Sequence, residues 1–95
     1  MTKRVMHLIN TIASINLLKI HAFLFVFFTI IYMSMDFEKH FNSKQKNAIY
    51  FSASVHSGVG FGDISPITDD AKILVALHAM CSFGSTLLVI SRSRR

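Results

Sequence analysis

The sequence has few charges and a single cysteine. Charged residues make up 16% of its 95 residues, against about 25% in an ordinary soluble domain. Hydrophobic residues make up 52%, which is more than so short a chain can bury in a core of its own. Because Cys81 has no second cysteine to pair with, an internal disulfide and a CxxC metal site are excluded. A soluble monomer is therefore not expected.

The chain also lacks the motifs of nucleic-acid and nucleotide binding. Its net charge of +5 is compatible with a polyanionic partner, but the basic residues flank apolar runs and do not alternate with aromatic ones. The glycines of residues 58–62 have neither the GxGxxG spacing nor the preceding strand of a dinucleotide site. We therefore expect no nucleic-acid partner, no cofactor and no enzyme activity.

A first long apolar run predicts a membrane-spanning helix. The run Ile20–Met35 has no formally charged residue and reaches about 24 Å as a helix, less than the roughly 30 Å hydrocarbon core of a bilayer. We therefore expect the span to cover residues 17–35, with the Lys19 side chain extending to the interface.

A second apolar run, Ile73–Ser91, predicts a second span within residues 68–91. The run alone reaches about 28 Å as a helix. Thr68 is a suitable N-cap, and the acidic Asp69 and Asp70 favour the positive end of a helix dipole.

The residues before the first span, 1–16, have the pattern of an amphipathic helix lying at the membrane interface. One helical face is apolar: Val5, Leu8, Ile9, Ile12 and Ile15. The other is polar: Lys3, Arg4, His7, Asn10, Thr11 and Ser14. A mitochondrial targeting segment is an open alternative, because no acidic residue occurs before Asp36.

The distribution of charge predicts that both termini are cytoplasmic in a two-pass integral membrane protein. The basic residues outside the segment between the spans have no acidic neighbours: Lys3, Arg4, Lys19, Arg92, Arg94 and Arg95. Residues 36–72, between the two apolar runs, have four lysines against five acidic residues, a sum of −1. The charges do not indicate which membrane the protein spans.

The segment between the spans, residues 36–64, contains a short helical pattern followed by alternating glycines. Asn42 or Ser43 is a suitable cap for a helix that ends near His56. Irregular backbone at membrane depth occurs only where it is buried in protein or lines a watery cavity, so the glycines favour a re-entrant pore loop. Glycine also adopts the positive φ values that direct successive carbonyl oxygens toward one axis. Such oxygens can replace the water around a cation.

The stretch Val55–Pro66 resembles the TxxTVG[YF]GD signature of potassium channels, and the whole chain resembles the miniature potassium channels of algal viruses. The resemblance implies an all-α membrane protein with two transmembrane helices, a re-entrant pore helix and a selectivity-filter loop. It also implies a homotetrameric pore domain in a lipid membrane, through which K⁺ ions pass. The carbonyl groups implied to bind K⁺ are those of Gly58, Val59, Gly60 and Phe61.

The resemblance also implies residues that support the filter. They are Tyr50, Phe51, Ser54, Ser57, Gly62 and Asp63. Asp63 is expected to bond to Ser54 or Tyr50 behind the filter, whereas Tyr50 and Phe51 either brace the filter or pack against lipid. The chain departs from the signature at Gly58 and Val55, where threonines are usual. The innermost ion site is therefore expected to lack a ring of hydroxyl groups and to bind ions more weakly.

Polar residues on one face of the second span are candidates for the lining of the pore cavity. They are His78, Ser82, Ser85 and Val89, with Thr86 adjoining. Polar groups within a membrane usually face an aqueous cavity or a bundle interior, but they also hold helices together. His56, beside the filter, is expected to be a hydrogen-bonded packing residue, with a proton sensor as the alternative.

These observations favour passive conduction of K⁺ without a voltage sensor, since no Arg-rich helix is present. Two alternatives remain open. One is a weakly selective cation channel that lacks the hydroxyl ring at Gly58, and the other is a non-conducting protein that targets or scaffolds a membrane.

Overall fold

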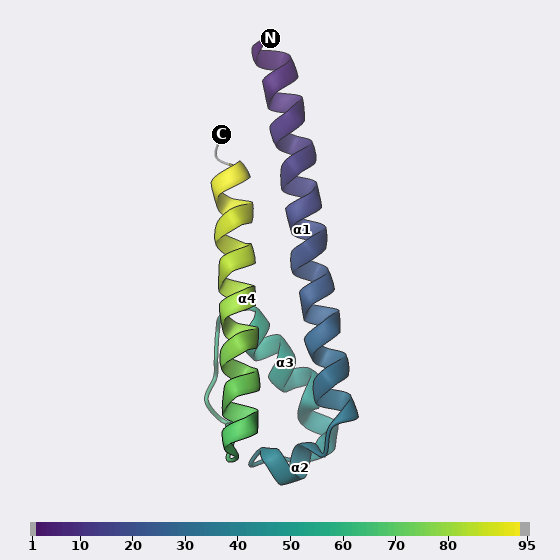
Figure 1. Ribbon diagram of the computed structural model, residues 1–95, viewed down its shortest axis with the longest axis vertical. Coiled ribbons are helices and arrows are strands. Elements are labelled where there is room, and N and C mark those ends of the chain that lie inside the picture. The colour runs from purple at the N-terminus through teal and green to yellow at the C-terminus, as the bar shows by residue number, and fades with distance from the viewer. Residues whose placement is uncertain (1, 94–95) are drawn as a thin grey trace.

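The computed structural model describes residues 2–93, which are helical over most of their length. The elements are α1 (Lys3–Ser34), α2 (Phe37–His40), the 3-10 helix η1 (Gln45–Asn47), α3 (Ala48–His56) and α4 (Asp69–Ser93). The long helices α1 and α4 run antiparallel, and α3 lies between them in one half of the molecule (Figure 1). The start of α1 and the end of α4 therefore lie toward the same end of a molecule 56 Å long.

Helix α1 is continuous, so the predicted boundary at residue 16 is wrong. The Thr2 hydroxyl caps its start by accepting a hydrogen bond from the backbone N–H of Val5 at 3.3 Å. The helix then continues for 32 residues because the sequence has neither glycine nor proline before residue 36 to interrupt it. Residues 3–16 of the amphipathic segment are thus the first half of α1, and the position of the segment at the interface stays a prediction.

Helix α4 begins where the sequence predicts and extends two residues beyond the predicted end. The Thr68 hydroxyl accepts a hydrogen bond from the N–H of Ala71 at 3.3 Å, which confirms the predicted cap. Asp69 and Asp70 form the acidic first turn. Arg94 and Arg95, which support the predicted orientation, lie outside the described residues.

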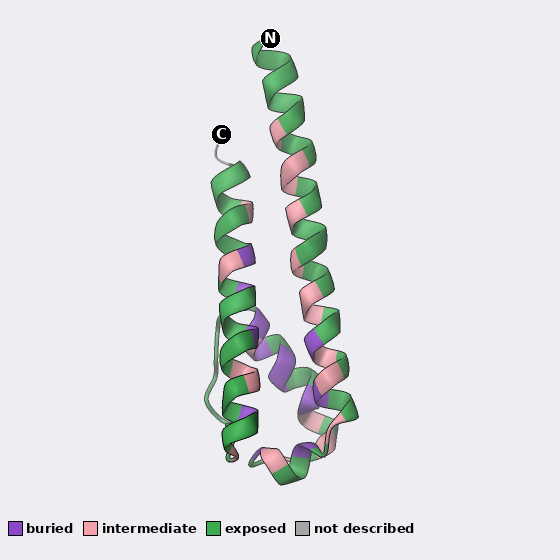
Figure 2. Cartoon of the chain, in the orientation of Figure 1, coloured by how far each residue is buried: buried purple, intermediate pink, exposed green. Residues whose placement is uncertain are grey.

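Both long helices are long and apolar enough to cross a membrane. Only 11% of the apolar stretch of α1 and 17% of that of α4 are buried within the chain. Figure 2 shows the exposed faces in green along both helices, with the buried residues gathered where α3 lies between them. These faces are the surface that lipid or other chains must cover.

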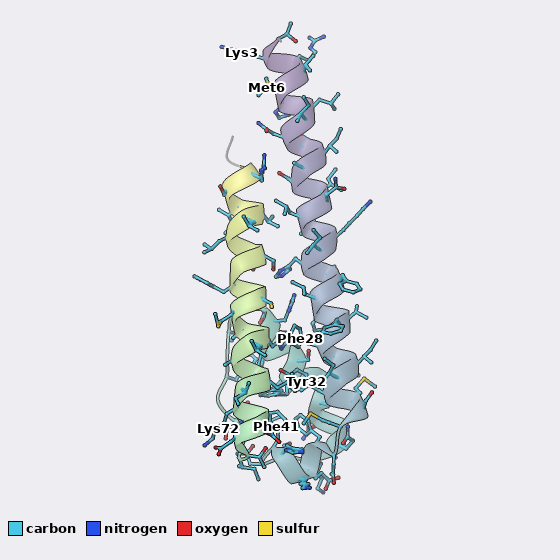
Figure 3. The ribbon with its side chains drawn as sticks, in the orientation of Figure 1. Lys3, Met6, Phe28, Tyr32, Phe41 and Lys72 are labelled. Atoms are coloured by element: carbon cyan, nitrogen blue, oxygen red, sulfur yellow. The ribbon has the colours of Figure 1, made fainter. Side chains whose placement is uncertain are left out.

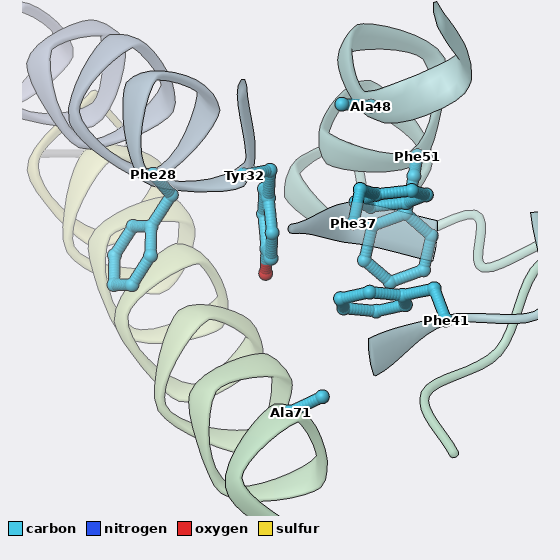
Figure 4. Packing of buried hydrophobic residues seen from close by; sticks show 7 residues of the cluster. All are labelled: Phe28, Tyr32, Phe37, Phe41, Ala48, Phe51 and Ala71. Atoms are coloured by element: carbon cyan, nitrogen blue, oxygen red, sulfur yellow. The ribbon is translucent and has the colours of Figure 1, made fainter. Parts of the chain in front are cut away.

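The buried core is a mainly aromatic cluster (Figure 4) in the half of the molecule away from the chain termini (Figure 3). Its members are Phe28, Tyr32, Phe37, Phe41, Ala48, Phe51 and Ala71. The Tyr32 ring is fully buried and meets the rings of Phe37, Phe41 and Phe51 edge-on, at centroid distances of 6.5, 5.9 and 5.3 Å. Figure 3 shows Phe28, Tyr32 and Phe41 between the helices, whereas Lys3 and Met6 lie where α1 projects alone. The cluster fixes α3 against both long helices.

The start of α3 differs from the prediction, because neither Asn42 nor Ser43 caps it. Its N-cap is Asn47, which makes no side-chain cap bond, and η1 precedes it. The Asn42 side chain instead accepts a hydrogen bond from the N–H of Ser65 at 2.8 Å, and the Ser43 hydroxyl accepts one from the Asn47 amide at 2.8 Å. Asn42 is therefore used to join the segment before α3 to the segment before α4, next to the bridge between Phe41 and Pro66.

Candidate functional site

The loop after α3 has the alternating backbone that its glycines predict. Gly58, Gly60 and Gly62 have φ values of +81°, +55° and +80°, and no other described residue has a positive φ. Val59 and Phe61 lie between them. The left-handed region costs a residue with a side chain roughly 1–2 kcal/mol. The glycines therefore permit this backbone, and the alternation begins at Gly58, where the potassium-channel signature has threonine.

The N–H groups of the loop are tied to α3, whereas its carbonyl groups are not. Gly58 donates to the carbonyl of Val55 at 3.1 Å, and Gly60 donates to that of Ser54 at 2.9 Å. Within residues 2–93, no hydrogen bond ends on the carbonyl oxygens of residues 58–61. Residues 58–61 are exposed. Their carbonyl oxygens are therefore open to water or to a cation.

The Phe61–Asp63 end of the loop is held by Tyr50. The Tyr50 hydroxyl donates to the Asp63 carboxylate at 2.9 Å, which confirms one of the two predicted partners. The other partner, Ser54, donates instead to the carbonyl of Phe51 at 2.8 Å. The Tyr50 ring also stacks parallel to that of Phe61, with centroids 5.9 Å apart. The hydrogen bond to Asp63 raises the pKa of the Tyr50 phenol above its ordinary value.

Tyr50 and Phe51, whose roles do not follow from the sequence, have different surroundings. Tyr50 is exposed and contacts the loop, whereas Phe51 is buried in the aromatic core. At the C-cap of α3, Ser57 donates through its side chain to the carbonyl of Ser54 at 3.3 Å. Tyr50 therefore touches the loop directly, and Phe51 acts on it only by holding α3.

The second half of α3 is joined to both long helices. The Ser52 hydroxyl is hydrogen-bonded to that of Thr29 in α1 at 2.7 Å. The buried ring of His56 is hydrogen-bonded to the carbonyl of His21 in α1 at 2.8 Å and to the ring of His78 in α4 at 3.0 Å. His56 is thus the hydrogen-bonded packing residue that the sequence favours.

Of the four residues predicted to line a cavity on α4, Ser82 borders the cavity next to the loop, whereas His78, Ser85 and Val89 do not. His78, Ser82 and Ser85 are buried against α1 and α3 within the same chain. Ser82 donates to the carbonyl of His56, and Ser85 is bonded to the ring of His21 at 2.5 Å. Val89, further along α4, is partly buried. The alternative, that polar groups join the helices, is the one that the structure supports, because helical spacing groups residues on a face without saying what that face meets.

The face of α4 that borders the loop shares Ser82 with the predicted face and otherwise differs from it. A cavity of about 630 Å³ lies between α4 and the start of the loop, near Gly58. The loop side is formed by Val55, His56, Ser57, Gly58 and Gly60. The α4 side is formed by Val75, Ala79, Ser82, Phe83 and Thr86. The sequence analysis missed Val75 and Ala79, although their spacing of four residues, continued by Phe83, is the signal of a second helical face.

Comparisons with known proteins agree with this geometry. An ion channel family model matches residues 19–95. The chain is 38% identical over 73 residues to the potassium channel protein kcv of Paramecium bursaria Chlorella virus 1, an alignment that covers 67% of this chain and 78% of that protein. No solved structure matches.

Proposed function

The chain belongs to the ion channel family, and on that premise we propose that it is one subunit of a potassium channel that lets K⁺ pass down its electrochemical gradient. It is an all-α integral membrane protein with two long apolar helices. The observation that carries the proposal is the run of free carbonyl oxygens at residues 58–61, on a backbone of alternating φ. The viral relative is a potassium channel by its name.

The carbonyl oxygens of Gly58, Val59, Gly60 and Phe61 take the place of water around K⁺ in this proposal. A single loop presents its oxygens from one side only, so one chain does not surround an ion. Four loops around a common axis supply a ring of oxygens at each level, as in potassium channel filters. A homotetramer is therefore part of the proposal, and it also accounts for the large apolar surface that one chain leaves exposed.

The loop is supported before any ion arrives. The N–H groups of Gly58 and Gly60 hold its inner half to α3, and Tyr50 holds its outer half through Asp63 and Phe61. Supports of this kind keep the oxygens from closing toward one another, so that replacing the water of the ion costs little rearrangement.

At the inner end, Gly58 has no hydroxyl group to offer. We infer that the innermost site is built from carbonyl oxygens alone, opens toward the cavity beside Ala79, Phe83 and Thr86, and holds ions more weakly than the sites at residues 59–61.

The orientation that we propose places both termini in the cytoplasm and the loop on the outer side. The start of α1 and the end of α4 lie toward the same end (Figure 1), and Lys3, Arg4 and Arg92 lie in these terminal parts. Basic residues favour the cytoplasmic side of a membrane. The host or viral membrane needs to supply no cofactor, because passive conduction involves only the permeant ion and no enzyme chemistry.

Flux of K⁺ into liposomes that contain the purified protein tests the proposal. Gly60→Ala is expected to abolish the flux, because φ at residue 60 is +55° and a built Cβ there meets no other atom, so only the backbone is strained. Gly84→Ala is the matched control, since Gly84 is helical and its built Cβ also meets nothing.

Three outcomes of this experiment decide between the functions. Flux in wild type and Gly84→Ala but not in Gly60→Ala supports the filter. Equal fluxes of K⁺ and Na⁺ indicate the weakly selective cation channel instead. No flux from tetrameric wild-type protein leaves the scaffold protein as the better account.

A further inference from the structure

Residues 61–64, in the second half of the loop, make no backbone hydrogen bond within residues 2–93. Just before them, Gly60 donates its N–H to the carbonyl of Ser54 in α3 at 2.9 Å. Just after them, Ser65 donates its N–H to the side-chain oxygen of Asn42 at 2.8 Å. The backbone of residues 61–64 is therefore held at its two ends, by the bonds of Gly60 and Ser65.

Asn42 engages both polar backbone groups of Ser65. Its side-chain Oδ1 accepts a hydrogen bond from the Ser65 N–H, and its own N–H donates to the Ser65 carbonyl at 3.2 Å. The pairing continues in the β-bridge between Phe41 and Pro66. A single residue from the segment before α3 thus satisfies the first bonded backbone groups that follow residues 61–64.

The segment that contains Asn42 is itself fixed to the core. The side chain of the neighbouring Phe41 is buried, and its ring stacks on that of Phe37 with centroids 4.3 Å apart. On the other side of Phe41, the His40 ring is hydrogen-bonded to the hydroxyl of Thr68 at 2.6 Å, and Thr68 caps α4. Asn42 therefore connects Ser65 to buried packing and to the start of a long helix.

The other contacts of residues 61–64 are made by side chains. Tyr50 bonds to the Asp63 carboxylate and stacks on the Phe61 ring, and Ile64 packs partly buried against the aromatic core. Contacts of this kind do not satisfy the backbone groups that follow Asp63. The bonds at Asn42 supply that part of the support.

We propose that Asn42 is a positioning residue of the filter, which fixes the end of residues 61–64 and thereby the position of the Phe61 carbonyl oxygen. The inference rests on the proposed channel function. Asn42 does not touch the ion in this account. It acts through the backbone of Ser65, by favouring the loop conformation in which the oxygens nearest Asp63 can bind K⁺.

An ion bound at these oxygens favours the same conformation. A ligand that binds to one of two conformations raises the population of that conformation by mass action. Loss of the Asn42 bond is therefore expected to matter most when the K⁺ concentration on the loop side of the membrane is low, and to be offset when it is high. A defect in assembly changes the number of channels and has no such dependence on K⁺.

The test is the ratio of open to closed time of single channels in a lipid bilayer, at a fixed voltage and with low or high K⁺ on the loop side. One net hydrogen bond changes an equilibrium constant by a factor of about 2–12. Asn42→Ala is therefore expected to lower the ratio at least about fivefold at low K⁺. At high K⁺ the ratio is expected to return to that of the wild type.

Two further variants identify the bond that matters. Asn42→Asp keeps a side-chain oxygen for the Ser65 N–H and is expected to match the wild type, because the Asn42 amide nitrogen donates no hydrogen bond within the described residues. Asn47→Ala is the matched control. It removes a bond of the same length, 2.8 Å, from the Asn47 amide to the Ser43 hydroxyl, which does not reach residues 61–65. It is expected to leave the ratio unchanged.

Three results overturn the proposal. They are a wild-type ratio in Asn42→Ala at low K⁺, an equal loss in Asn42→Asp, and a loss in Asn42→Ala that high K⁺ on the loop side does not relieve. Wild-type channels that carry no K⁺ current at all contradict the channel function itself, which is a different failure.

A second measurement needs neither a variant nor a current. Hydrogen exchange of the backbone amides in the wild-type protein in lipid reports whether the Ser65 N–H is bonded. The proposal requires the Ser65 amide to exchange at least about tenfold more slowly than an unprotected amide. Exchange of Ser65 at the unprotected rate overturns the proposal even where the channel conducts.

Discussion

Replacing Gly58 by threonine restores the residue usual in the potassium channel signature, and the structure predicts that this change destabilises the protein. Gly58 has a φ of +81°, in the region where a β-branched residue is strained. At about 1–2 kcal/mol for each chain, the four chains of the proposed tetramer lose about 4–8 kcal/mol of assembly free energy. The space around residue 58 does not add to this, since a built Cβ meets no atom within 4 Å.

The assay is the fraction of tetramer in detergent, measured by mass while the temperature is raised. Gly58→Ala is expected to lower the midpoint of dissociation, Gly58→Thr to lower it further, and Gly84→Ala to leave it unchanged. The order follows from φ alone, because none of these positions is crowded. Tetramers of Gly58→Thr as stable as the wild type would show that residue 58 does not have a positive φ.

Any Gly58→Thr tetramers that form supply a second readout at the inner site. Four new hydroxyl groups would offer oxygen ligands there, so Ba²⁺ from the cytoplasmic side is expected to block more tightly than in the wild type. Unchanged block by Ba²⁺ would contradict the position of Gly58 at the innermost site.

Three further predictions concern the supports of the loop. Phe51→Ala removes a buried ring from the aromatic core and is expected to lower stability by about 3–5 kcal/mol in thermal unfolding, whereas the same change at the exposed Phe23 should have a much smaller effect. Thr29→Val removes the hydroxyl bonded to Ser52 and is expected to cost about 1 kcal/mol in the same measurement; an unchanged midpoint would contradict a role for this bond. The bond to Asp63 raises the pKa of Tyr50 above its ordinary value of about 10. The hydrogen bond that holds the loop is therefore fully present below pH about 10 and is lost as the pH rises through the raised pKa of the folded protein. K⁺ current should therefore decline only above that ordinary value, and Tyr50→Phe, which keeps the ring but not the hydroxyl, should be reduced at neutral pH and show no further alkaline decline.

The spans and the loop were predictable from the sequence because each depends on local chemistry. Ile73–Ser91 is apolar and long enough to cross a bilayer whatever surrounds it. Gly60 and Gly62 require a backbone that glycine adopts easily, and the structure has it at both. The cap at Thr68 is likewise a contact between residues three apart.

The errors arose where a choice depended on distant residues. Asn42 is an acceptable cap, but Ser65, far along the chain, offers it another hydrogen bond. His78, Ser82 and Ser85 share a face of α4 under either interpretation, and only the positions of Tyr32, His56 and His21 show that this face meets the same chain. The periodicity of one helix does not reveal which residues of other helices it contacts.

The reversal potential of the current through reconstituted channels, with K⁺ on one side and Na⁺ on the other, tests the central claim most directly. Within residues 2–93, no hydrogen bond reaches the carbonyl oxygens of residues 58–61. We expect these oxygens to give a strong preference for K⁺ over Na⁺. We expect the reversal potential to lie near the equilibrium potential of K⁺ and to shift with it when the K⁺ gradient is changed. A reversal potential near zero with K⁺ opposite an equal concentration of Na⁺ would contradict a potassium-selective filter at these residues.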